Sequence, residues 1–194
     1  MPQLLFTPLA ECRWCKLLGE ARENKFDPTK RPAWSVELVL KNSDPDHIAW
    51  IEAMEGKFAE LHGESKKSNN WIPVRPDKEK PRELSVASFK LPEFERKDGG
   101  KSEGPVVFDS NNNPWNPQKM IGNGSKIIVA FDIYAWKGST GAGMTFQPRQ
   151  VQVVEYLAYE ADKSAAVSAF TPVPGGFVDS DNVFNEAPGL TTED

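Results

Sequence analysis

The feature that most constrains the fold is a strand pattern at residues 121–136, IGNGSKIIVAFDIYAW, in which apolar and other residues alternate after a glycine turn. Neighbouring residues of a strand point to opposite faces. One face would therefore carry Ile127, Val129, Phe131, Ile133 and Ala135, and the other Ala130, Asp132, Tyr134 and Trp136. We predict that the first face lies in the core. The second face places two aromatic rings at the end of the strand, which a core does not explain.

Further short strands are expected before and after this one. The segment RPAWSVELVL alternates Trp34, Val36, Leu38 and Leu40 with other residues, as half-buried strands do. WIPV, RELSVASFKLPEF, PVVFD and MTFQPRQVQVVEYLAYE are strand candidates separated by Pro, Gly and charged turns. In the last of these, Val151 and Val153 share a face, and Pro148 predicts a bulge or an edge.

One helix is expected at SDPDHIAWIEAMEGKFAELHG, with Ser43 or Asp44 as N-cap, an early Pro45 and Gly63 as the stop. Its apolar stripe, which we predict to pack in the core, consists of Ile48, Ile51, Met54, Phe58 and Leu61. About six or seven short strands with one helix favour a Greek-key barrel over a doubly wound sheet, which needs repeated βαβ units. The predicted fold class is therefore mainly β with one main helix, an OB-fold-like Greek-key barrel.

The chain of 194 residues is long enough for one domain with a core and an extension. After Lys163 there is no Lys or Arg, so five carboxylates beyond it carry the whole net charge of −5. Pro, Gly, Ser, Thr and acidic residues fill this part, which is a composition typical of disorder. We expect an OB-fold domain at 1–163 and a flexible acidic tail at 164–194. Because neither a membrane span nor a secretory leader is found, we expect a cytosolic protein with no membrane partner.

The residue types that most often build metal or catalytic sites form no such pattern. The only cysteines and histidines are Cys12, Cys15, His47 and His62, and their spacing fits no zinc site well. The cysteines are interpreted as partly buried thiols on a strand. The turn GNGS enters a strand and lacks the Gly-Lys-Ser/Thr ending of a P-loop, so a simple turn is favoured over a phosphate cradle. We expect no enzyme, no metal and no cofactor, and a metal-dependent nuclease with scattered carboxylate ligands stays open as a minority alternative.

The segment GNGSKIIVAFDIYAWKGSTGAGMTFQPRQVQVVEYL resembles the single-stranded DNA-binding proteins of podovirus-type phages. In that family a Gly-x-Gly-Ser turn leads into a long strand, a glycine-containing loop and a run like Val-Gln-Val-Val-Glu-Tyr. The segments FKLPEFERKDGGKSEGPVVFDSNNNPW and FDPTKRPAWSVELVL are similar to its earlier strands, so the resemblance covers residues 6–160 and is best at 84–157. It implies an OB fold that coats single-stranded DNA during phage DNA replication and recombination, in the cytoplasm of the infected bacterial host. A homodimer is left open.

Aromatic and basic side chains are interleaved in a way that fits this function on physical grounds. A binder without strong sequence preference needs cations for phosphates and exposed rings for bases, because every base has a π-face. The candidate single-stranded DNA-binding residues are Trp71, Arg75, Phe89, Lys90, Tyr134, Trp136, Lys137 and Arg149. The alternative is a phage structural or interaction module, in which the rings meet protein instead of bases.

The tail is the candidate partner-binding segment. The resemblance implies that it contacts replication proteins such as a polymerase, helicase or nuclease. Its candidate residues are Asp179, Asp181, Phe184, Glu186, Glu193 and Asp194. The chain ends GLTTED without the terminal aromatic residue familiar in such tails, so the internal Phe184 is the candidate for that role. Five carboxylates without a cation cannot help to bind DNA, but a tethered acidic segment can compete with DNA for a cationic groove. A merely solubilising tail is the alternative.

Overall fold

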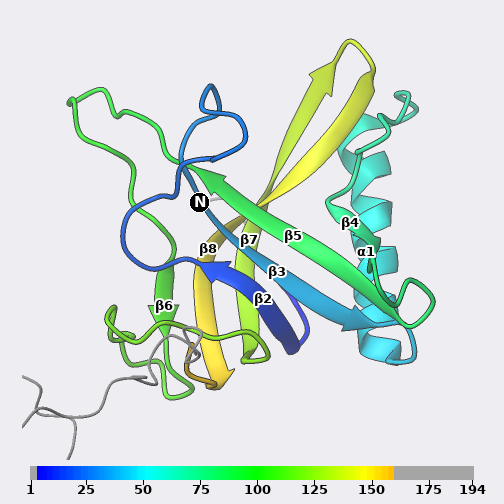
Figure 1. Ribbon diagram of the computed structural model, residues 1–194. Coiled ribbons are helices and arrows are strands. Elements are labelled where there is room, and N and C mark those ends of the chain that lie inside the picture. The colour runs from blue at the N-terminus through cyan, green and yellow to red at the C-terminus, as the bar shows by residue number, and fades with distance from the viewer. Residues whose placement is uncertain (1–3, 160–194) are drawn as a thin grey trace, which may run out of the picture. The chain divides into compact units, whose positions relative to one another are not determined.

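A computed structural model describes residues 4–159 of the chain, and the acidic tail expected at 164–194 lies outside them. The described part contains eight strands and one helix (Figure 1). Their order is β1 (Leu5–Phe6), β2 (Ala10–Lys16), β3 (Ala33–Lys41), α1 (Pro45–His62), β4 (Val74–Pro76), β5 (Leu84–Pro92), β6 (Val106–Phe108), β7 (Lys126–Gly138) and β8 (Gly141–Glu155).

Five of the strands close into a barrel. The hydrogen-bonded order runs β7, β2, β3, β5 and β8, and β8 pairs again with β7 along its whole length, which closes the ring. β5 and β8 pair in parallel at Phe89 and Phe146, whereas the other pairs in the ring are antiparallel. β1 and β6 extend the sheet beside β7 and β8, and β4 pairs with β5. The predicted fold class, an OB-like barrel that is mainly β with one helix, is confirmed.

Aromatic rings fill the interior of this barrel. Phe89, Phe131 and Phe146 are fully buried, and their ring centroids lie 5.0–5.5 Å apart. Trp50 of α1 lies within 5.8–6.3 Å of all three centroids, and its indole N–H donates to the Phe6 carbonyl oxygen at 3.0 Å. Aromatic pairs at such separations stabilise the fold beyond the area that they bury. Trp50 therefore fixes α1 to the barrel.

The helix begins and ends as the sequence predicts, but it buries a different face. Asp44 caps it by accepting a backbone hydrogen bond from the first turn, Pro45 stands at its start, and Gly63 ends it with a φ of 58°. Its buried residues are His47, Trp50, Met54, Phe58 and His62. The prediction that Ile48 and Leu61 belong to the core stripe is wrong, because both side chains are exposed.

Hydrogen bonds explain why two histidines take the place of those apolar residues. His47 Nδ1 accepts from the Lys41 N–H at 2.8 Å, and its Nε2 donates to the Leu9 carbonyl at 3.1 Å. His62 Nε2 donates to the Gly143 carbonyl at 2.9 Å. A buried polar group costs little relative to water where it is hydrogen-bonded, as both ring nitrogens of His47 and Nε2 of His62 are. Within the described residues, His62 Nδ1 is buried without a partner. The face of α1 that is buried is therefore set by these hydrogen bonds to other parts of the chain, and it differs from the purely apolar stripe of the sequence.

A β-bulge in β2 turns both cysteines toward the interior. The register with β3 shifts between Arg13 and Lys16, and Trp14 takes a left-handed φ of 52°. Cys12 is buried and Cys15 half-buried against the core, while Trp14 is exposed. The neighbouring Cys12 thiol and burial raise the pKa of Cys15, so this thiol stays protonated. These positions agree with the partly buried thiols expected on a strand.

Within residues 4–159, no helix is long and apolar enough to cross a membrane. In that same part of the chain, no group of three or more His, Cys, Asp or Glu side chains is arranged to hold a metal ion.

The β7–β8 hairpin is longer than the barrel and projects beyond it beside α1 (Figure 1). Ala130 pairs with Gln150 and the next residue, Phe131, pairs with Pro148, so Arg149 of β8 has no partner on β7 and the register shifts there. This is the bulge that Pro148 predicts. The hairpin therefore bends as it leaves the barrel.

The segment that follows α1 anchors the tip of the hairpin. The Ala142 N–H donates to the Lys66 carbonyl at 2.8 Å, and the Ser68 N–H donates to the Ala142 carbonyl at 3.0 Å. A Cβ atom at Gly141 would lie 2.7 Å from Lys66 O, and Gly141 also has a φ of 138°. Glycine is therefore required where the two backbones meet.

Phe89→Ala is expected to lower the free energy of unfolding by about 3–5 kcal/mol, because it removes a ring from a fully buried cluster. The adjacent Lys90→Ala should change it by no more than about 0.5 kcal/mol, because that side chain is exposed. Urea unfolding followed by fluorescence measures both variants. Equal losses would contradict the assignment of Phe89 to the core.

Candidate nucleic-acid interface

The prediction that Phe89 stacks on a base is wrong. Its ring is 0% exposed and lies inside the barrel, where no base can reach it. On β5 the side chains of Ala87, Phe89 and Leu91 are buried, whereas Ser88 is partly exposed and Lys90 is exposed. β5 therefore contributes Lys90, and not Phe89, to a surface site.

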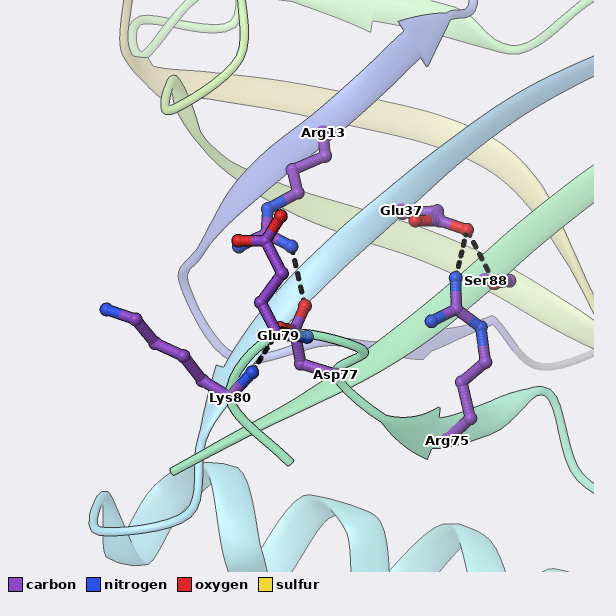
Figure 2. Close-up of polar contacts among 7 residues, drawn as sticks. All are labelled: Arg13, Glu37, Arg75, Asp77, Glu79, Lys80 and Ser88. Atoms are coloured by element: carbon purple, nitrogen blue, oxygen red, sulfur yellow. Dashed lines mark hydrogen bonds and ion pairs between the residues drawn. The ribbon is translucent and has the colours of Figure 1, made fainter. Parts of the chain in front are cut away.

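Ion pairs neutralise the outer face of β2, β3 and β5 (Figure 2). Arg75 Nη2 lies 2.8 Å from Glu37 Oε1, which also accepts from Ser88 Oγ at 3.4 Å. Arg13 Nη1 donates to Asp77 Oδ2 at 2.6 Å. A phosphate that approached Arg75 would also meet the Glu37 carboxylate. Arg75, a predicted contact residue, is therefore not a free cation.

Asp77 organises the loop that follows β4. Its Oδ1 accepts from the backbone N–H groups of Glu79 and Lys80, each at 3.0 Å (Figure 2). The Lys80 N–H and the Arg13 guanidinium hold the pKa of Asp77 below its usual range. Because the folded pKa is the lower one, the stabilisation is present above pH ~4 and is lost as the pH falls through the folded pKa. Arg13 therefore stays paired at neutral pH.

Arg149 sits in the bulge of β8 and is also paired. Its Nε donates to Asp132 Oδ2 at 2.9 Å, and its Nη2 donates to Gln147 Oε1 at 3.0 Å. Asp132 and Gln147 face each other across β7 and β8. The guanidinium thus holds the two strands together at the bulge, and its charge is balanced there.

Trp71 is half-buried, and other side chains cover its ring. Lys67 Nζ lies 3.7 Å from the ring centroid, and Phe58 packs edge-on at 5.1 Å between centroids. The Trp71 carbonyl accepts from the Met144 N–H at 2.8 Å. Trp71 therefore fixes the segment after α1 to the hairpin, and a base would have to displace Lys67 to stack on it.

A groove of about 590 Å³ contains two of the predicted contact residues, Lys90 and Tyr134. Its lining consists of Lys30, Arg31, Lys90, Leu91, Pro92, Phe94, Tyr134, Thr145 and Gln147. Three of these side chains are cationic and none is a carboxylate. The Tyr134 side chain is 58% exposed. The groove thus presents positive charge beside an accessible aromatic ring.

The cations of this groove are largely unneutralised. Within the described residues, Arg31 and Lys90 form no ion pair. Lys30 lies 3.5 Å from an Asp27 carboxylate oxygen, and both side chains are exposed. Exposed pairs of this kind contribute only about 0–1 kcal/mol, so a phosphate can replace the carboxylate at little cost.

The loop at residues 17–32, which carries two of these cations, is tied back to the barrel. The Trp34 indole N–H donates to the Gly19 carbonyl at 2.9 Å, and the Glu93 N–H donates to the Pro32 carbonyl at 2.8 Å. The backbone N–H groups of Arg22 and Ala33 each donate to the carbonyl of the other residue at 3.0 Å. Sequence reasoning missed Lys30, Arg31 and Phe94. The run TKRP before a strand was a visible signal for the two cations, but only the folded loop brings them beside the end of β5.

Trp136 continues the row that Tyr134 begins. The two residues lie on one face of the hairpin, opposite Gly143 and Thr145 of β8. A Cβ atom at Gly143 would lie 2.3 Å from Trp136 Cζ2, so the indole lies against the β8 backbone. Residues two apart on a strand are separated by about 7 Å. Lys137 is exposed but belongs to the opposite face, across from Ala142.

No family model and no curated protein matches this sequence. The fold is that of single-stranded DNA-binding proteins of bacteriophages. The crystal structure of gp2.5, a single-stranded DNA-binding protein encoded by bacteriophage T7, aligns with a TM-score of 0.58 and 20% identity, over 92% of this chain and 99% of that one. The single-stranded DNA-binding protein from bacteriophage Enc34, in complex with single-stranded DNA, aligns with a TM-score of 0.62 and 13% identity, over 80% of this chain and 88% of that one. At these identities the likeness establishes a shared fold.

Gly143→Ala is expected to push the Trp136 indole off β8, because the added methyl group would occupy the ring's position. The chain has six tryptophans, so a ¹⁵N-labelled sample gives one indole N–H signal for each. The Trp136 signal is identified as the one that disappears in Trp136→Phe. We expect Gly143→Ala to shift this signal more than the other five. The control Gly56→Ala adds a methyl group in open space on α1 and should leave the six signals in place. An unchanged Trp136 signal in Gly143→Ala would contradict the contact.

Proposed function

We propose that this protein binds single-stranded DNA without strong sequence preference during phage DNA replication and recombination. The observation that carries the proposal is the groove, in which three cations and an exposed Tyr134 ring occur together without a lining carboxylate. The two solved phage proteins described above are single-stranded DNA-binding proteins, one of them in complex with single-stranded DNA, which supports the proposal.

Cationic and aromatic side chains would bind different parts of a DNA strand. Lys30, Arg31 and Lys90 attract phosphates. Because counterions are released when phosphates are neutralised, this part of the binding free energy depends on the salt concentration. Tyr134 and Trp136 offer rings for bases, and each stacked base contributes about 1–3 kcal/mol. Neither contact reads a base edge, so the binding is expected to tolerate any sequence. Bases must be unpaired to reach the rings, so duplex DNA satisfies only the phosphate contacts.

The position of the groove in the barrel agrees with this assignment. Oligonucleotides bind OB folds on the second and third strands and at the loops joining strands one to two and four to five. In this barrel those elements are β3 and β5, the loop at residues 17–32, and the β7–β8 hairpin. All of them except β3 contribute side chains to the groove.

Oligo-dT is expected to bind more tightly than a duplex of equal length, and Lys90→Ala should reduce the salt dependence of that binding. The slope of log affinity against log salt should fall by about 0.7 for each phosphate contact removed. Arg75→Ala is the matched control, because Glu37 already balances this guanidinium. Fluorescence titration at several salt concentrations measures all three proteins. Equal affinity for duplex and single strand would remove the proposal, and a larger slope change in Arg75→Ala would place the phosphates on the outer face.

We further propose that the acidic tail recruits phage replication proteins. This part of the proposal rests on the sequence alone, because residues 164–194 lie outside the described part of the chain. Five carboxylates without a cation, tethered to a domain with a cationic groove, would compete with DNA for that groove at high effective concentration. DNA that fills the groove would release the tail to a basic patch on a polymerase, helicase or nuclease. Strand coating would then be coupled to recruitment.

Deletion of residues 177–194 is expected to tighten oligo-dT binding, most strongly at salt concentrations below 0.1 M, where the Debye length exceeds ~10 Å. The same deletion should abolish pull-down of the replication partner. A full-length control replaces Asp179, Asp181 and Glu186 by the corresponding amides, which removes three of the five carboxylates and should reproduce part of the tightening. Unchanged affinity of the truncated protein at every salt concentration would contradict the competition.

A further inference from the structure

Phe26 is the most exposed large apolar side chain of the described residues. It is 99% exposed, whereas the next value in this set is 64%, at Phe6. Single exposed apolar residues are common on protein surfaces and need no special reason. The position of Phe26 is informative because of the loop that holds it and the charges around it.

Polar contacts link the backbone groups around Phe26 into two successive turns. Asn24 Oδ1 accepts from the Phe26 N–H at 3.0 Å and from the Asp27 N–H at 3.3 Å. Asp27 Oδ1 accepts from the Thr29 N–H at 3.2 Å, and the Lys30 N–H donates to the Asp27 carbonyl at 3.1 Å. The contacts to Thr29 and Lys30 also hold the pKa of Asp27 below its usual range, so the carboxylate that organises the loop is charged. The backbone of such a preorganised turn loses little entropy when a ligand binds.

The loop that carries Phe26 continues through a second turn into the groove. Lys25 precedes Phe26 in the chain, and Lys30 and Arg31, which follow a few residues later, line the groove. An aromatic ring among cations is the combination that binds single-stranded nucleic acid. Phe94, which also lines the groove, is about half exposed. Rings and cations therefore continue from the groove onto the loop.

We propose that Phe26 is a further base-stacking residue, which extends the strand-binding surface from the groove onto the tip of the loop at residues 17–32. The inference rests on the proposed function, since it adds a contact to the same ligand. A strand whose phosphates reach Lys30 and Arg31 can place a further base on Phe26, because the ring precedes these cations by four and five residues in the same loop. The ring is open to solvent on all sides and needs no rearrangement to accept a base.

The experiment compares Phe26→Ala with wild type on oligo-dT of two lengths, about 4 and about 16 nucleotides, which bracket the site sizes of OB folds. For the longer oligonucleotide we expect a loss of about 5- to 150-fold in affinity, the equivalent of one stacked base. The slope against log salt should stay unchanged, because no charge is removed. Phe26→Leu should behave like the alanine variant, and Phe26→Trp should retain or tighten binding. Phe6→Ala, at the other strongly exposed phenylalanine, is the matched control and should bind like wild type.

Photocrosslinking supplies a second readout. Oligo-dT that carries 5-iodouracil should crosslink to the tryptic peptide at residues 26–30, FDPTK, in the wild-type protein. If the wild type fails to bind oligo-dT at either length, the proposed function is overturned and this inference with it. If the wild type binds and Phe26→Ala binds equally well, the inference alone is overturned. Loss of a replication-protein contact in Phe26→Ala, with DNA affinity intact, would also overturn it and assign the ring to a protein interface.

Discussion

The antiparallel pairing of β7 with β8 is the interaction on which the rest of the structure depends. It closes the five-stranded ring and brings Phe131 and Phe146 against Phe89, so that one aromatic cluster with Trp50 holds the barrel and the helix together. Because the two strands run past the barrel, the same pairing also builds the platform outside it. Residues of β7 and β8 that alternate with the core residues place Tyr134 and Trp136 on an outer face. Core and candidate site are thus two faces of one hairpin.

The positive surface of the protein depends on which cations are paired with carboxylates, and not on the total number of cations. The chain up to residue 163 holds 23 basic and 23 acidic side chains, so its net charge favours no anionic partner. On the outer face, Glu37 and Asp77 neutralise Arg75 and Arg13. The groove has cations without lining carboxylates. A formally neutral body therefore presents one local positive surface beside exposed rings, and local potential is what attracts a charged ligand.

The sequence predicted those features that local patterns determine. The buried positions Ile127, Val129 and Phe131, the strand at 31–40, the helix with its Asp44 cap and the bulge at Pro148 all follow from residues close together in the chain. Ala135, which was predicted to share the core face, is exposed because β7 has left the barrel there. The alternate spacing of Ala87, Phe89 and Leu91 is also a local signal that Phe89 belongs to the core, whereas its neighbour Lys90 indicates only that the opposite face of the strand is exposed. The buried face of the helix could not be predicted, because His47 and His62 are buried only where distant carbonyl groups accept their hydrogen bonds.

The arrangement of the site was harder to predict because it depends on contacts between distant parts of the chain. The partners Glu37 and Arg75 are 38 positions apart in the sequence, and Arg13 and Asp77 are 64 apart. The contact between Trp136 and Gly143 depends on the hairpin register, and the position of Lys30 depends on how its loop is tied to the barrel. Residue type therefore indicated what kind of ligand to expect, whereas the fold decides which cations and rings remain free to meet it.

We propose that the strand binds in the groove and on the outer face of the hairpin, rather than on the ion-paired outer face of β2, β3 and β5. Amide chemical-shift changes in the ¹⁵N-labelled full-length protein on addition of oligo-dT test this directly. We expect the shifts to concentrate at residues 25–31, 90–94 and 134–147, whereas the amide signals of Arg13, Glu37, Arg75 and Asp77 should stay in place. Shifts centred on those four residues, with the groove unchanged, would contradict it.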